Sequence, residues 1–559
     1  MGVVTRAQSK RLRSQQSGSE SDSEEPPPRG GEEEQGPDLI NLLPDEILGS
    51  IISLLTNMEG ARAQILSSRW RPLWRSAPLN LDASGLCGMK EAVVSRILAE
   101  HQGIVRRFRV WPFNLDADSA TLDSWLRSPV LDNLQELGFS YPFVWPGPLM
   151  PHSALRFSST LRVAKFSGCQ FLDDAGHQLH LPNLQHLELG SVIISENSLH
   201  TLLAGCPALD KFVFGYIHEP PRRPQLPPSA LHFPSTLRIA EFGGCRFPKT
   251  MDHQVHFPNL QQLVLESVSI SEGSLHAMLS GCPALNNLRL GYSSGFRQFR
   301  INSLKLKHVE IYFADRLQEL IVENAPCLER LDHCGAYEDN MHISIISAPK
   351  LEILGRLTDN FSILQLGTTV FKGLNDVRIS TVMRTVKVLA LRFYKLRPDV
   401  IFNFMKCFPC MEKLYIKTHG DTGYPTQSHK DRNECFEHHL KKLWINYSAC
   451  KWSDIQFVKF IVLNSRVLES LVLNVEKHKK ESSRYVKKER KRLQLSRRAS
   501  RGAQIEFTSD DCFKEFPSPD PHLVWKLPHW GLLMTVSIIS MTFSFSYLGD
   551  IEEFPDPCE

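Results

Sequence analysis

Three short motifs contain residue types that could carry chemistry. Residues 291–295 read Gly-Tyr-Ser-Ser-Gly, which fits the Gly-x-Ser-x-Gly turn that presents a nucleophilic serine in hydrolases. Cys407 and Cys410 have the spacing of one half of a zinc site, and residues 437–439, Glu-His-His, combine a carboxylate with two imidazoles. Each motif needs further groups at fixed positions before it can act as a nucleophile or bind a metal ion.

The surrounding sequence does not supply those groups. The nucleophile turn requires a helix directly after it, and residues 296–301, Phe-Arg-Gln-Phe-Arg-Ile, give no helix start. No second cysteine pair stands at a suitable distance from Cys407 and Cys410, so we expect buried thiols there. The two histidines of residues 437–439 are adjacent, which does not place both on one helical face. We therefore expect no catalytic residue, no metal ion and no cofactor, and a hydrolase is the least supported function.

Length and composition favour a protein of several parts in a reducing compartment. At 559 residues the chain exceeds what one hydrophobic core normally serves. Its 13 cysteines, an odd number without compact spacing, suit reduced thiols. Residues 1–37 lack the apolar run of a secretory signal, change from basic to acidic and are rich in Ser, Pro and Gly, which predicts a disordered tail. We expect the nucleus, the cytoplasm or both as the location.

Residues 38–82 have the spacing of three short helices with more apolar side chains than so small a unit can bury. Residues 47–55 place apolar side chains three, four and seven apart, which predicts an amphipathic helix that begins near Pro44. Trp70 and Trp74, four apart, give the last helix one aromatic side. An exposed apolar face of this kind usually marks a partner site. The alternative is a helical cap on a larger domain.

Three phrases in this segment form a specific pattern: Leu-Pro-Asp-Glu-Ile-Leu at 43–48, Ile-Leu-Ser-Ser-Arg-Trp-Arg at 65–71 and Leu-Trp at 73–74. The pattern resembles the F-box of plant F-box proteins and departs from its usual wording at Thr56 and Ser68. The resemblance implies docking onto a Skp-type adaptor, and through it onto a cullin and RING ubiquitin-ligase scaffold. The residues that it assigns to adaptor binding are Leu43, Pro44, Ile47, Leu48, Ile51, Leu55, Ile65, Leu66, Arg69, Trp70 and Trp74.

The body of the chain contains an internal duplication. Residues 180–216 and 256–292 are offset by 76 positions and are identical at 23 of 37 aligned positions. The copies extend upstream, so that the duplicated region covers about 151–292. The phrase Leu-x-x-Leu-x-Leu recurs with a period of about 25 residues, for example at 184–189 and 285–290, which is typical of leucine-rich repeats.

These repeats predict a solenoid over residues 83–430, with one strand and one helical or irregular return per repeat. Short helices are expected to begin at Ser198 and Ser274. Alternation along each strand turns the leucines inward and leaves the residues between them exposed on a concave surface. The expected fold class is α/β, an N-terminal three-helix F-box followed by a leucine-rich-repeat solenoid. The concave residues assigned to target binding are Lys165, Glu188, Glu241 and Arg289.

The last third of the chain has further motifs. Residues 435–445, Cys-Phe-Glu-His-His-Leu-Lys-Lys-Leu-Trp-Ile, and residues 468–471, Leu-Glu-Ser-Leu, look like the FBD domain of plant F-box proteins, which we expect at 431–507. Residues 477–501 hold twelve Lys or Arg against two Glu. Such a run can bind nucleic acid, but it contains a single aromatic residue, which favours a solvated surface.

Residues 508–559 are expected to form a C-terminal tail. Its residues 530–548 are apolar enough to suggest a membrane anchor, but the stretch barely reaches the length of a span and contains several Ser and Thr. Aromatic and hydroxyl residues alternate over 541–547, which is strand periodicity. A terminal strand or a poorly folded tail is therefore expected rather than a membrane helix.

The resemblance implies a substrate-recognition subunit of an SCF-type (Skp–cullin–F-box) ubiquitin ligase, without catalytic activity of its own. The helical segment binds the adaptor, and the repeats bind a protein target that the sequence does not identify. The alternative is a non-degradative scaffold whose repeats and basic run bind a protein or nucleic acid. If the chain is a ubiquitin-ligase subunit, we expect neither nucleic acid nor a membrane as its partner.

Overall fold

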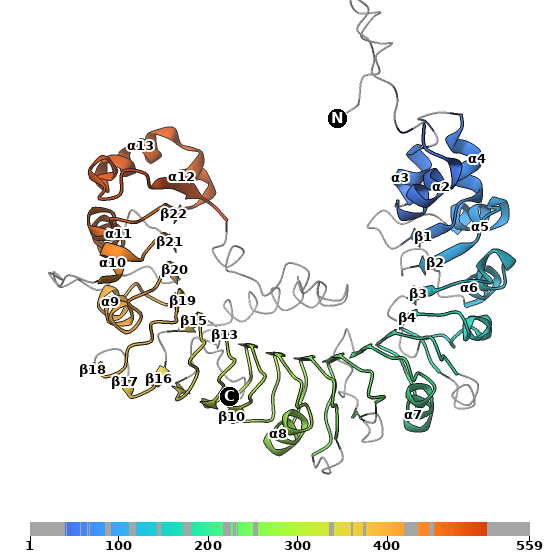
Figure 1. Cartoon of the computed structure of the whole chain (residues 1–559), viewed down its shortest axis with the longest axis horizontal. Helices are drawn as coiled ribbons and strands as arrows, with labels where there is room; N and C mark the ends of the chain where they lie inside the picture. The colour runs from blue at the N-terminus through green and yellow to red at the C-terminus, as the bar shows by residue number, and fades with distance from the viewer. Residues whose placement is uncertain are drawn as a thin grey trace, which may run out of the picture.

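In the described residues, the computed structural model is a curved solenoid with three short helices at its N-terminal end (Figure 1). Residues 1–37 and the apolar residues 530–548 lie outside the described part of the chain. The structure describes residues 40–510 except 41, 56, 64, 66–67, 84–90, 111–118, 142–146, 172–179, 216–224, 227–230, 232, 250–254, 335–339, 359–360, 373–375, 419–433 and 447–451.

A parallel sheet runs along the inner, concave side of the curve (Figure 1). In the described residues it has 17 strands, each paired in parallel with the strand of the next repeat, so the predicted leucine-rich-repeat solenoid is confirmed. In spatial order the strands are β1 (Leu79–Ala83), β2 (Val105–Val110), β3 (Glu136–Ser140), β4 (Val163–Ser167), β5 (His186–Gly190), β6 (Lys211–Gly215), β7 (Ile239–Gly243), β8 (Gln262–Glu266), β9 (Asn287–Gly291), β11 (His308–Tyr312), β13 (Arg330–Cys334), β15 (Ile353–Thr358), β19 (Val388–Phe393), β20 (Lys413–Thr418), β21 (Lys442–Asn446), β22 (Ser470–Asn474) and β23 (Gln504–Thr508).

Alternation along these strands builds the core. In β5, Leu187 and Leu189 are completely buried on the convex side of the sheet, and Glu188 between them lies on the concave side. Leu443 and Ile445 of β21 are likewise completely buried. Burying such a side chain contributes about 1.5–3 kcal/mol, so the stacked aliphatic residues hold successive repeats together.

The returns on the convex side are mostly helical as far as residue 280 and again from residue 398, with strands in the repeats between (Figure 1). The middle returns form a second sheet, parallel through four strands and then antiparallel. Its strands are β10 (Gln298–Asn302), β12 (Glu319–Asn324), β14 (Met341–Ile345), β16 (Phe361–Leu366), β17 (Thr369–Lys372) and β18 (Asp376–Arg378). The helical returns are α5 (Glu91–Glu100), α6 (Ser119–Leu126), α7 (Glu196–Ala204), α8 (Glu272–Ser280), α9 (Pro398–Cys407), α10 (Glu434–His438) and α11 (Trp452–Asn464), with 3-10 turns at Pro129–Leu131 and His152–Phe157.

The duplication is visible in α7 and α8. The hydroxyls of Ser195 and Ser271, 76 residues apart, accept hydrogen bonds from the backbone N–H groups of Ser198 and Ser274. Each helix therefore begins two residues before the serine that was expected to start it. An N-cap serine satisfies an N–H group that the helix itself leaves unpaired, and both copies of the repeat use this device.

At both ends the parallel sheet runs across an expected domain limit. The limit expected at 82/83 falls inside β1, the first strand of the sheet. In the region expected as an FBD domain, β21, β22 and β23 continue the same parallel sheet. Among the described residues, no helix combines the length and the apolar character needed to cross a membrane.

Candidate interaction surfaces

The three N-terminal helices, α2 (Asp45–Leu54), α3 (Asn57–Ala63) and α4 (Trp70–Ser76), pack around a small core of their own. We call residues 40–77 the helical module. Its position on the solenoid is fixed by polar contacts: the Asn80 side chain donates to the carbonyl of Ser53 at 2.5 Å, and the backbone N–H groups of Gln102 and Gly103 donate to the carbonyl of Arg75 at 3.1 Å. The completely or largely buried residues of this core are Leu48, Ile52, Ala63, Trp70 and Ala77.

The helical module exposes large apolar side chains over a short length of sequence. Ile47 and Leu54 are 47% and 85% exposed and lie seven residues apart on α2, so they share one face of that helix. Ile65, which follows α3, is 83% exposed, and Ile40 and Leu42 before α2 are 53% and 72% exposed. So many exposed apolar side chains in one small module make it a candidate surface for contact with another protein.

The residues assigned to adaptor binding divide into three groups. Leu48 and Trp70 lie in the interior of the helical module, where they pack the three helices together. Leu43, Ile51, Leu55 and Trp74 are partly buried against that interior, and Pro44, Ile47 and Ile65 are exposed. Arg69 donates through Nε to Asp45 at 2.8 Å and through Nη2 to the carbonyl of Leu43 at 2.7 Å, which ties the start of α2 to α4. Leu66 lies outside the described residues.

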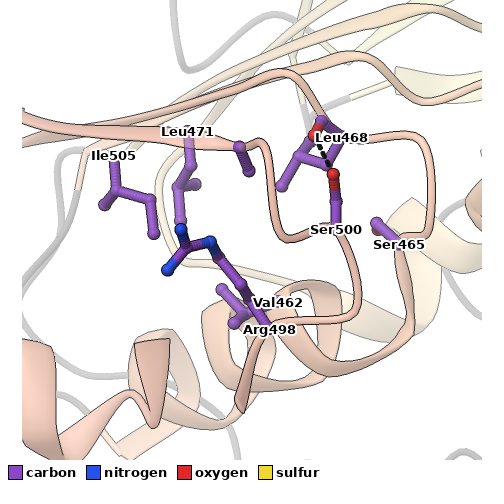
Figure 2. Close-up of a pocket in the computed structure, with 8 residues that line it drawn as sticks. Val462, Ser465, Leu468, Leu471, Arg498, Ser500 and Ile505 are labelled. Carbon is purple, nitrogen blue, oxygen red and sulfur yellow. Dashed lines mark hydrogen bonds between the residues drawn. The ribbon is translucent and has the colours of Figure 1, made fainter. Parts of the chain in front are cut away.

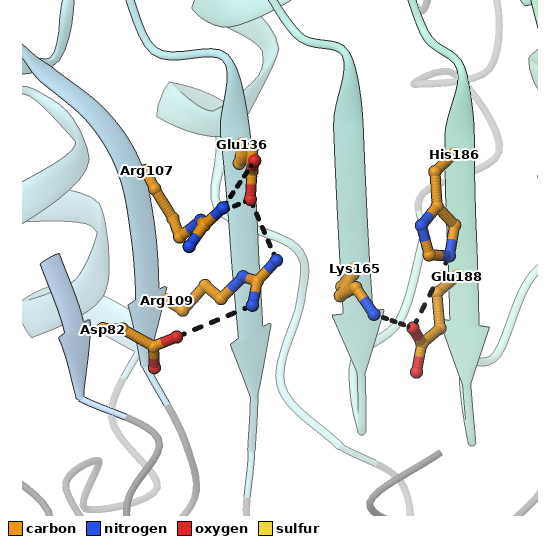
Figure 3. A network of polar contacts seen from close by, with 7 residues as sticks. All are labelled: Asp82, Arg107, Arg109, Glu136, Lys165, His186 and Glu188. Carbon is orange, nitrogen blue, oxygen red and sulfur yellow. Dashed lines mark hydrogen bonds and ion pairs between the residues drawn. The ribbon is translucent and has the colours of Figure 1, made fainter. Parts of the chain in front are cut away.

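The four residues assigned to target binding lie on the concave side, but they are not the exposed charges that the sequence analysis expects. Lys165 Nζ and Glu188 Oε2 are 2.5 Å apart, and their side chains are only 23% and 11% exposed (Figure 3). Glu241 pairs with Lys211 at 2.6 Å. Lys165 and Glu188 are in register on neighbouring strands, whereas Glu241 is in register with Val213, two residues after Lys211. In both pairs the charge is partly covered by the next repeat.

The pairing extends to the N-terminal strands. Arg107 donates through Nε and Nη2 to the carboxylate of Glu136 at 2.5 and 2.9 Å, and Arg109 lies 2.9 Å from Glu136 and 3.6 Å from Asp82 (Figure 3). Burial acts to raise the pKa of Glu136, but the two arginines outweigh it and lower that pKa. At this end of the concave surface, the charged side chains are therefore engaged in ion pairs with one another.

His186 lies beside the pair of Lys165 and Glu188 and is neutral. Burial, together with the positive charges of Lys165 and Lys211, lowers the pKa of His186 to about 3. Its Nε2 lies 3.8 Å from Glu188 (Figure 3). His186 thus carries no charge at physiological pH and adds no cation to the concave side.

In the middle of the sheet, Arg289 belongs to a compact three-residue group. Its Nε donates to the hydroxyl of Tyr312 at 2.8 Å, its guanidinium lies 4.8 Å from the centre of that ring, and the Tyr312 hydroxyl donates to Glu266. Tyr312 of β11 reaches Glu266 of β8 by crossing β9 at Gly291, where a Cβ would stand 2.4 Å from the tyrosine ring. Only glycine leaves room for that crossing.

Gly291 is also the first residue of the Gly-x-Ser-x-Gly motif at 291–295, in which Ser293 has the position of the nucleophile. The Ser293 hydroxyl is completely buried and donates to the backbone carbonyls of Gly291 at 2.9 Å and Leu265 at 3.2 Å. Ser294 then forms a parallel bridge with Ser269 rather than starting a helix. Both features differ from a nucleophile turn, so the motif has a structural role here.

The cysteine pair also has a structural setting. Burial raises the pKa of the Cys407 thiol to about 12, which disfavours the thiolate that a metal ion needs. Cys407 closes α9, and Cys410 lies in the turn before β20. Within the described part of the chain, no three His, Cys, Asp or Glu side chains are grouped closely enough to hold a metal ion.

A second charged cluster, which the sequence analysis missed, surrounds Asp332 on β13. Asp332 is completely buried and receives hydrogen bonds from Arg330 at 3.1 Å and from Arg356 at 2.8 and 2.5 Å. Arg330 also lies 3.7 Å from Glu310. Burial acts to raise the pKa of Asp332, but Arg356 and Arg330 outweigh it, so that the net pKa is lowered. The pKa of Glu310 is raised by its own burial and by the charge of Asp332.

An apolar strip follows on the concave side of the C-terminal strands, and the sequence analysis missed it as well. We define the concave strip as Val388, Ala390, Tyr415, Trp444 and Val472, which form a cluster separate from the main core. Tyr415, Trp444 and Val472 are in register on β20, β21 and β22. Strand alternation in phrases such as Leu-Trp-Ile at 443–445 would have revealed it, because it places the central aromatic residue opposite the core.

The basic run is folded against the last repeat. It forms α12 (Lys477–Glu481), α13 (Ser483–Arg492) and a 3-10 turn (Leu495–Arg497) between β22 and β23. Arg490 donates to the carbonyl of Ile505 at 3.2 Å, and Leu493 is completely buried. Lysines 487, 488 and 491 point away from this packing and are exposed, which gives the outer surface of α13 a positive charge.

Two hollows on the described surface differ in size. The first, beside α11 and the last strands, has Ser500 donating to the carbonyl of Leu468 at 2.5 Å and no room for a water molecule (Figure 2). The second, of about 510 Å³, lies between α8 and β10 and is open to solvent. Its walls mix apolar residues with Arg300 and Lys305.

Comparisons with known proteins give two family matches. The family described as FBD-associated F-box protein At5g56370, LRR repeats, matches residues 122–223 and 211–416, which together make up more than half of the chain. The FBD family matches residues 431–473. The two matches cover most of the solenoid, including the concave charges from Glu136 onward and the concave strip, but not Asp82, Arg107 and Arg109.

Individual relatives agree with these families. The chain is 31% identical over 312 residues to the F-box/LRR-repeat protein At3g58880 of Arabidopsis thaliana. The aligned residues make up 51% of this chain and 59% of that protein. It is 28% identical over 180 residues to the F-box/LRR-repeat protein At5g02700 of the same plant, covering 31% and 38%. The F-box/FBD/LRR-repeat protein At3g49030, also from Arabidopsis thaliana, is 23% identical over 493 residues, covering 86% and 95%. The chain thus matches less than two thirds of the length of the first two of these proteins.

Proposed function

This chain belongs to the plant F-box and leucine-rich-repeat proteins that carry an FBD domain, and from that premise we propose that it is the substrate-recognition subunit of an SCF-type ubiquitin ligase. In this proposal the helical module is the F-box and binds a Skp-type adaptor. The concave side of the solenoid binds a protein target. The chain itself contributes no catalytic group.

One observation supports the adaptor site above all others: the exposed apolar side chains at the free end of the solenoid. Ile47, Leu54 and Ile65 belong to the helical module and are each about half exposed or more. Covering apolar surface gains about 25 cal/mol per Å², so these residues gain most from a partner that buries them. The interior residues Leu48 and Trp70 hold the helices that present this surface.

The shape of the molecule supports a receptor rather than an enzyme. The helical module and the last repeats lie at opposite ends of the horseshoe (Figure 1), so one end can be anchored to an adaptor while the concave sheet holds a target. Anchoring raises the effective concentration of the target near a ubiquitin-conjugating enzyme on the same scaffold. No bond needs to be formed or broken by this chain.

Co-purification with a Skp-type adaptor tests the adaptor site. The variant Ile47→Asp with Ile65→Asp places two charges on the exposed apolar surface, and we expect adaptor affinity to fall about tenfold or more, because a central interface residue commonly contributes over about 1 kcal/mol. The matched control is Ile104→Asp. Ile104 is an exposed isoleucine on the solenoid, 41% exposed against 47% for Ile47, and this variant should retain the adaptor.

Two results would count against the proposal. Unchanged adaptor capture by the double variant would remove the helical module as the docking site. Equal loss in the Ile104→Asp control would show that any charge on exposed apolar surface disturbs the chain. Circular dichroism of all three proteins checks that the helices remain folded.

A further inference from the structure

In the described residues, strand β10 stands at the end of the second sheet, and one of its two edges has no strand beside it. The return of the preceding repeat is the helix α8, which lies next to β10 on the convex side (Figure 1). A helix uses its backbone N–H and C=O groups internally, so it cannot continue the hydrogen-bond ladder of the sheet. The edge of β10 that faces α8 is therefore open.

The hydrogen bonds around β10 show which peptide groups face this open edge. On the closed edge, the carbonyl of Arg297 accepts from the backbone N–H of Glu319 at 3.0 Å. On the open edge, the N–H of Gln298 donates to the carboxylate of Glu272 on α8 at 3.2 Å. Successive residues of a strand point their peptide groups to opposite edges, so the N–H and C=O of Arg300 share the open edge with Gln298. Neither group of Arg300 has a partner there among the described residues.

The larger of the two hollows lies against this open edge. We call it the edge groove; its volume is about 510 Å³, and its walls come from residues 276–285 and 299–306. Binding sites commonly have volumes of about 300–1,000 Å³. The turn at one end is fixed, because the Ser303 hydroxyl accepts from the backbone N–H of Leu306 at 3.2 Å. Leu304 within this turn is 64% exposed. The edge groove therefore combines unpaired peptide groups with apolar walls.

The internal duplication shows that this opening is particular to α8. Leu203 of α7 corresponds to Leu279 of α8, 76 residues later, and Leu203 is 1% exposed. Leu279 lines the edge groove and is only partly buried. His276, one helical turn before Leu279, also lines the groove, and its buried Nε2 has no hydrogen-bond partner among the described residues. The second copy of the repeat thus leaves both an apolar and a polar group for an occupant to contact.

Positive charge borders the edge groove. Arg297, Arg300 and Lys305 are exposed, and Arg300 contacts Glu323 at 2.8 Å. If two copies of this chain paired through β10, these charges would meet their own copies, and like charges on paired strands are destabilising. Basic side chains on an edge strand commonly prevent such pairing. The same charges attract an acidic strand from a different protein.

We propose that the edge groove binds an extended, acidic peptide segment of a partner protein, which adds a strand to β10. The backbone of the peptide pairs with the N–H and C=O of Arg300, and one of its apolar side chains packs against Leu279 and Leu304. Strand addition gains affinity from main-chain hydrogen bonds and specificity from alternate side chains. The groove lies on the convex side, apart from the helical module and the concave sheet, so binding there needs neither the adaptor nor a target on the concave side.

Selection from a peptide display library tests the proposal. Random peptides of about ten residues, the length of a long strand, are selected on the full-length chain and counter-selected on the variant Arg300→Pro. Proline removes the N–H that faces the open edge, and at such a position it leaves the ladder with β12 intact. We expect the enriched peptides to be acidic and to alternate charged with β-branched residues.

A synthetic, fluorescently labelled copy of the enriched peptide then allows a matched comparison by anisotropy. Its affinity should fall about tenfold or more in Arg300→Pro, because main-chain hydrogen bonds at the edge are lost. The control Arg300→Gln keeps the backbone N–H and should lower the affinity by about threefold at most, since an exposed charge contributes little. Equal losses in the two variants would assign binding to the charge and contradict strand addition. Circular dichroism checks that all three proteins are folded.

Hydrogen exchange of the unmodified chain keeps the test readable if Arg300→Pro misfolds. With the peptide bound, the amide of Arg300 should exchange more slowly, whereas the amide of Ile301, which already faces β12, should be unchanged. Three outcomes would overturn the proposal: no peptide survives the counter-selection, the enriched peptides are basic, or the exchange at Arg300 does not respond to the peptide. Each of them leaves adaptor binding by the helical module untouched.

Discussion

Arg356 donates two hydrogen bonds to Asp332, from Nε to Oδ1 at 2.8 Å and from Nη2 to Oδ2 at 2.5 Å, across the neighbouring strands β15 and β13. The contact depends on an irregularity of the backbone. Arg356 has φ +53°, and the register between β15 and β19 shifts between Leu354 and Leu357. A bulge of this kind re-aims a side chain. Here it turns the guanidinium towards a carboxylate that is completely buried.

The first prediction is that Asp332→Ala strongly destabilises the centre of the solenoid. Removing one partner of a buried ion pair commonly costs about 3–5 kcal/mol, because the remaining charge stays buried and unpaired. Hydrogen exchange of β13 and β15 measures the local effect. Asp332→Leu combined with Arg356→Leu should recover part of the loss, since it removes both members of this pair while Arg330 keeps Glu310 at 3.7 Å. Equal loss in the single and double variants would mean that the pair itself is not what matters.

The same carboxylate predicts an acid limit. The pKa of Asp332 lies below its ordinary value of 3.8 in the folded state. Its contribution is therefore fully present above pH 3.8 and is lost as the pH falls through the lowered pKa. Acid unfolding followed by circular dichroism should show a shallower pH dependence in the double leucine variant than in the parent chain.

Glu310 should have the opposite pH dependence. Its pKa is raised above the ordinary value of 4.5, first by burial and then by Asp332. A raised carboxyl pKa means that the folded state holds its proton more tightly, so the stability from this group is present below pH 4.5 and is lost as the pH rises. We expect Glu310→Gln to gain stability relative to the parent chain from pH 4.5 upward to neutral pH. A difference that does not vary with pH in urea unfolding would contradict this.

Features that depend on residues close together in the sequence could be predicted, and features that depend on contacts between repeats could not. The inward leucines, such as Leu187 and Leu189, repeat at fixed spacing, so the solenoid and the side of each strand could be predicted. The ion pairs could not be predicted, because Lys165 and Glu188 are 23 residues apart and come together only through the register of their strands. The bulge at Arg356 was not predicted, although Gly355 directly before it interrupts the strand pattern and is a signal for one.

The helical module shows the same limit. Helical spacing identifies Ile47 and Leu48 equally well as apolar residues, and the packing of three helices decides which of them faces inward. Leu48 is completely buried, whereas Ile47 is 47% exposed. Trp70 is an interior residue for the same reason. The sequence therefore predicts an apolar module but does not separate its core from its candidate docking surface.

A third prediction concerns Gly291→Ala. The added Cβ would stand 2.4 Å from the ring of Tyr312 and 2.6 Å from Glu266, both of which must then move. Overpacking of this kind costs about 1–3 kcal/mol. Tyr312→Leu in the same chain removes the ring that crosses β9 and should restore part of the stability in urea unfolding. An additive loss in the double variant would rule out the crossing as the reason for glycine.

A fourth prediction concerns the pair Lys165 and Glu188. Reversing one charge, Lys165→Glu, places two carboxylates on neighbouring strands in register and should destabilise β4 and β5 by about 0.2–1 kcal/mol. The swap Lys165→Glu with Glu188→Lys restores an opposite pair and should recover the loss. Hydrogen exchange of these strands distinguishes the two variants, and equal protection in both would show that the pair contributes nothing to local stability.

The last prediction separates a target receptor from a nucleic-acid scaffold. Neutralising the exposed α13 lysines, with Lys487→Gln, Lys488→Gln and Lys491→Gln, removes positive charge without touching the buried side of the helix. A receptor that uses the concave sheet keeps its protein target in this variant and loses it in the charge swap of Lys165 and Glu188, which inverts the surface while keeping the pair. A scaffold that binds nucleic acid shows the reverse, with affinity that falls steeply as salt rises, because phosphate contacts release counterions. Target capture by the two variants, measured at two salt concentrations, decides between them. Loss of binding in the lysine variant alone, together with a steep salt dependence, would overturn the receptor function of the repeats.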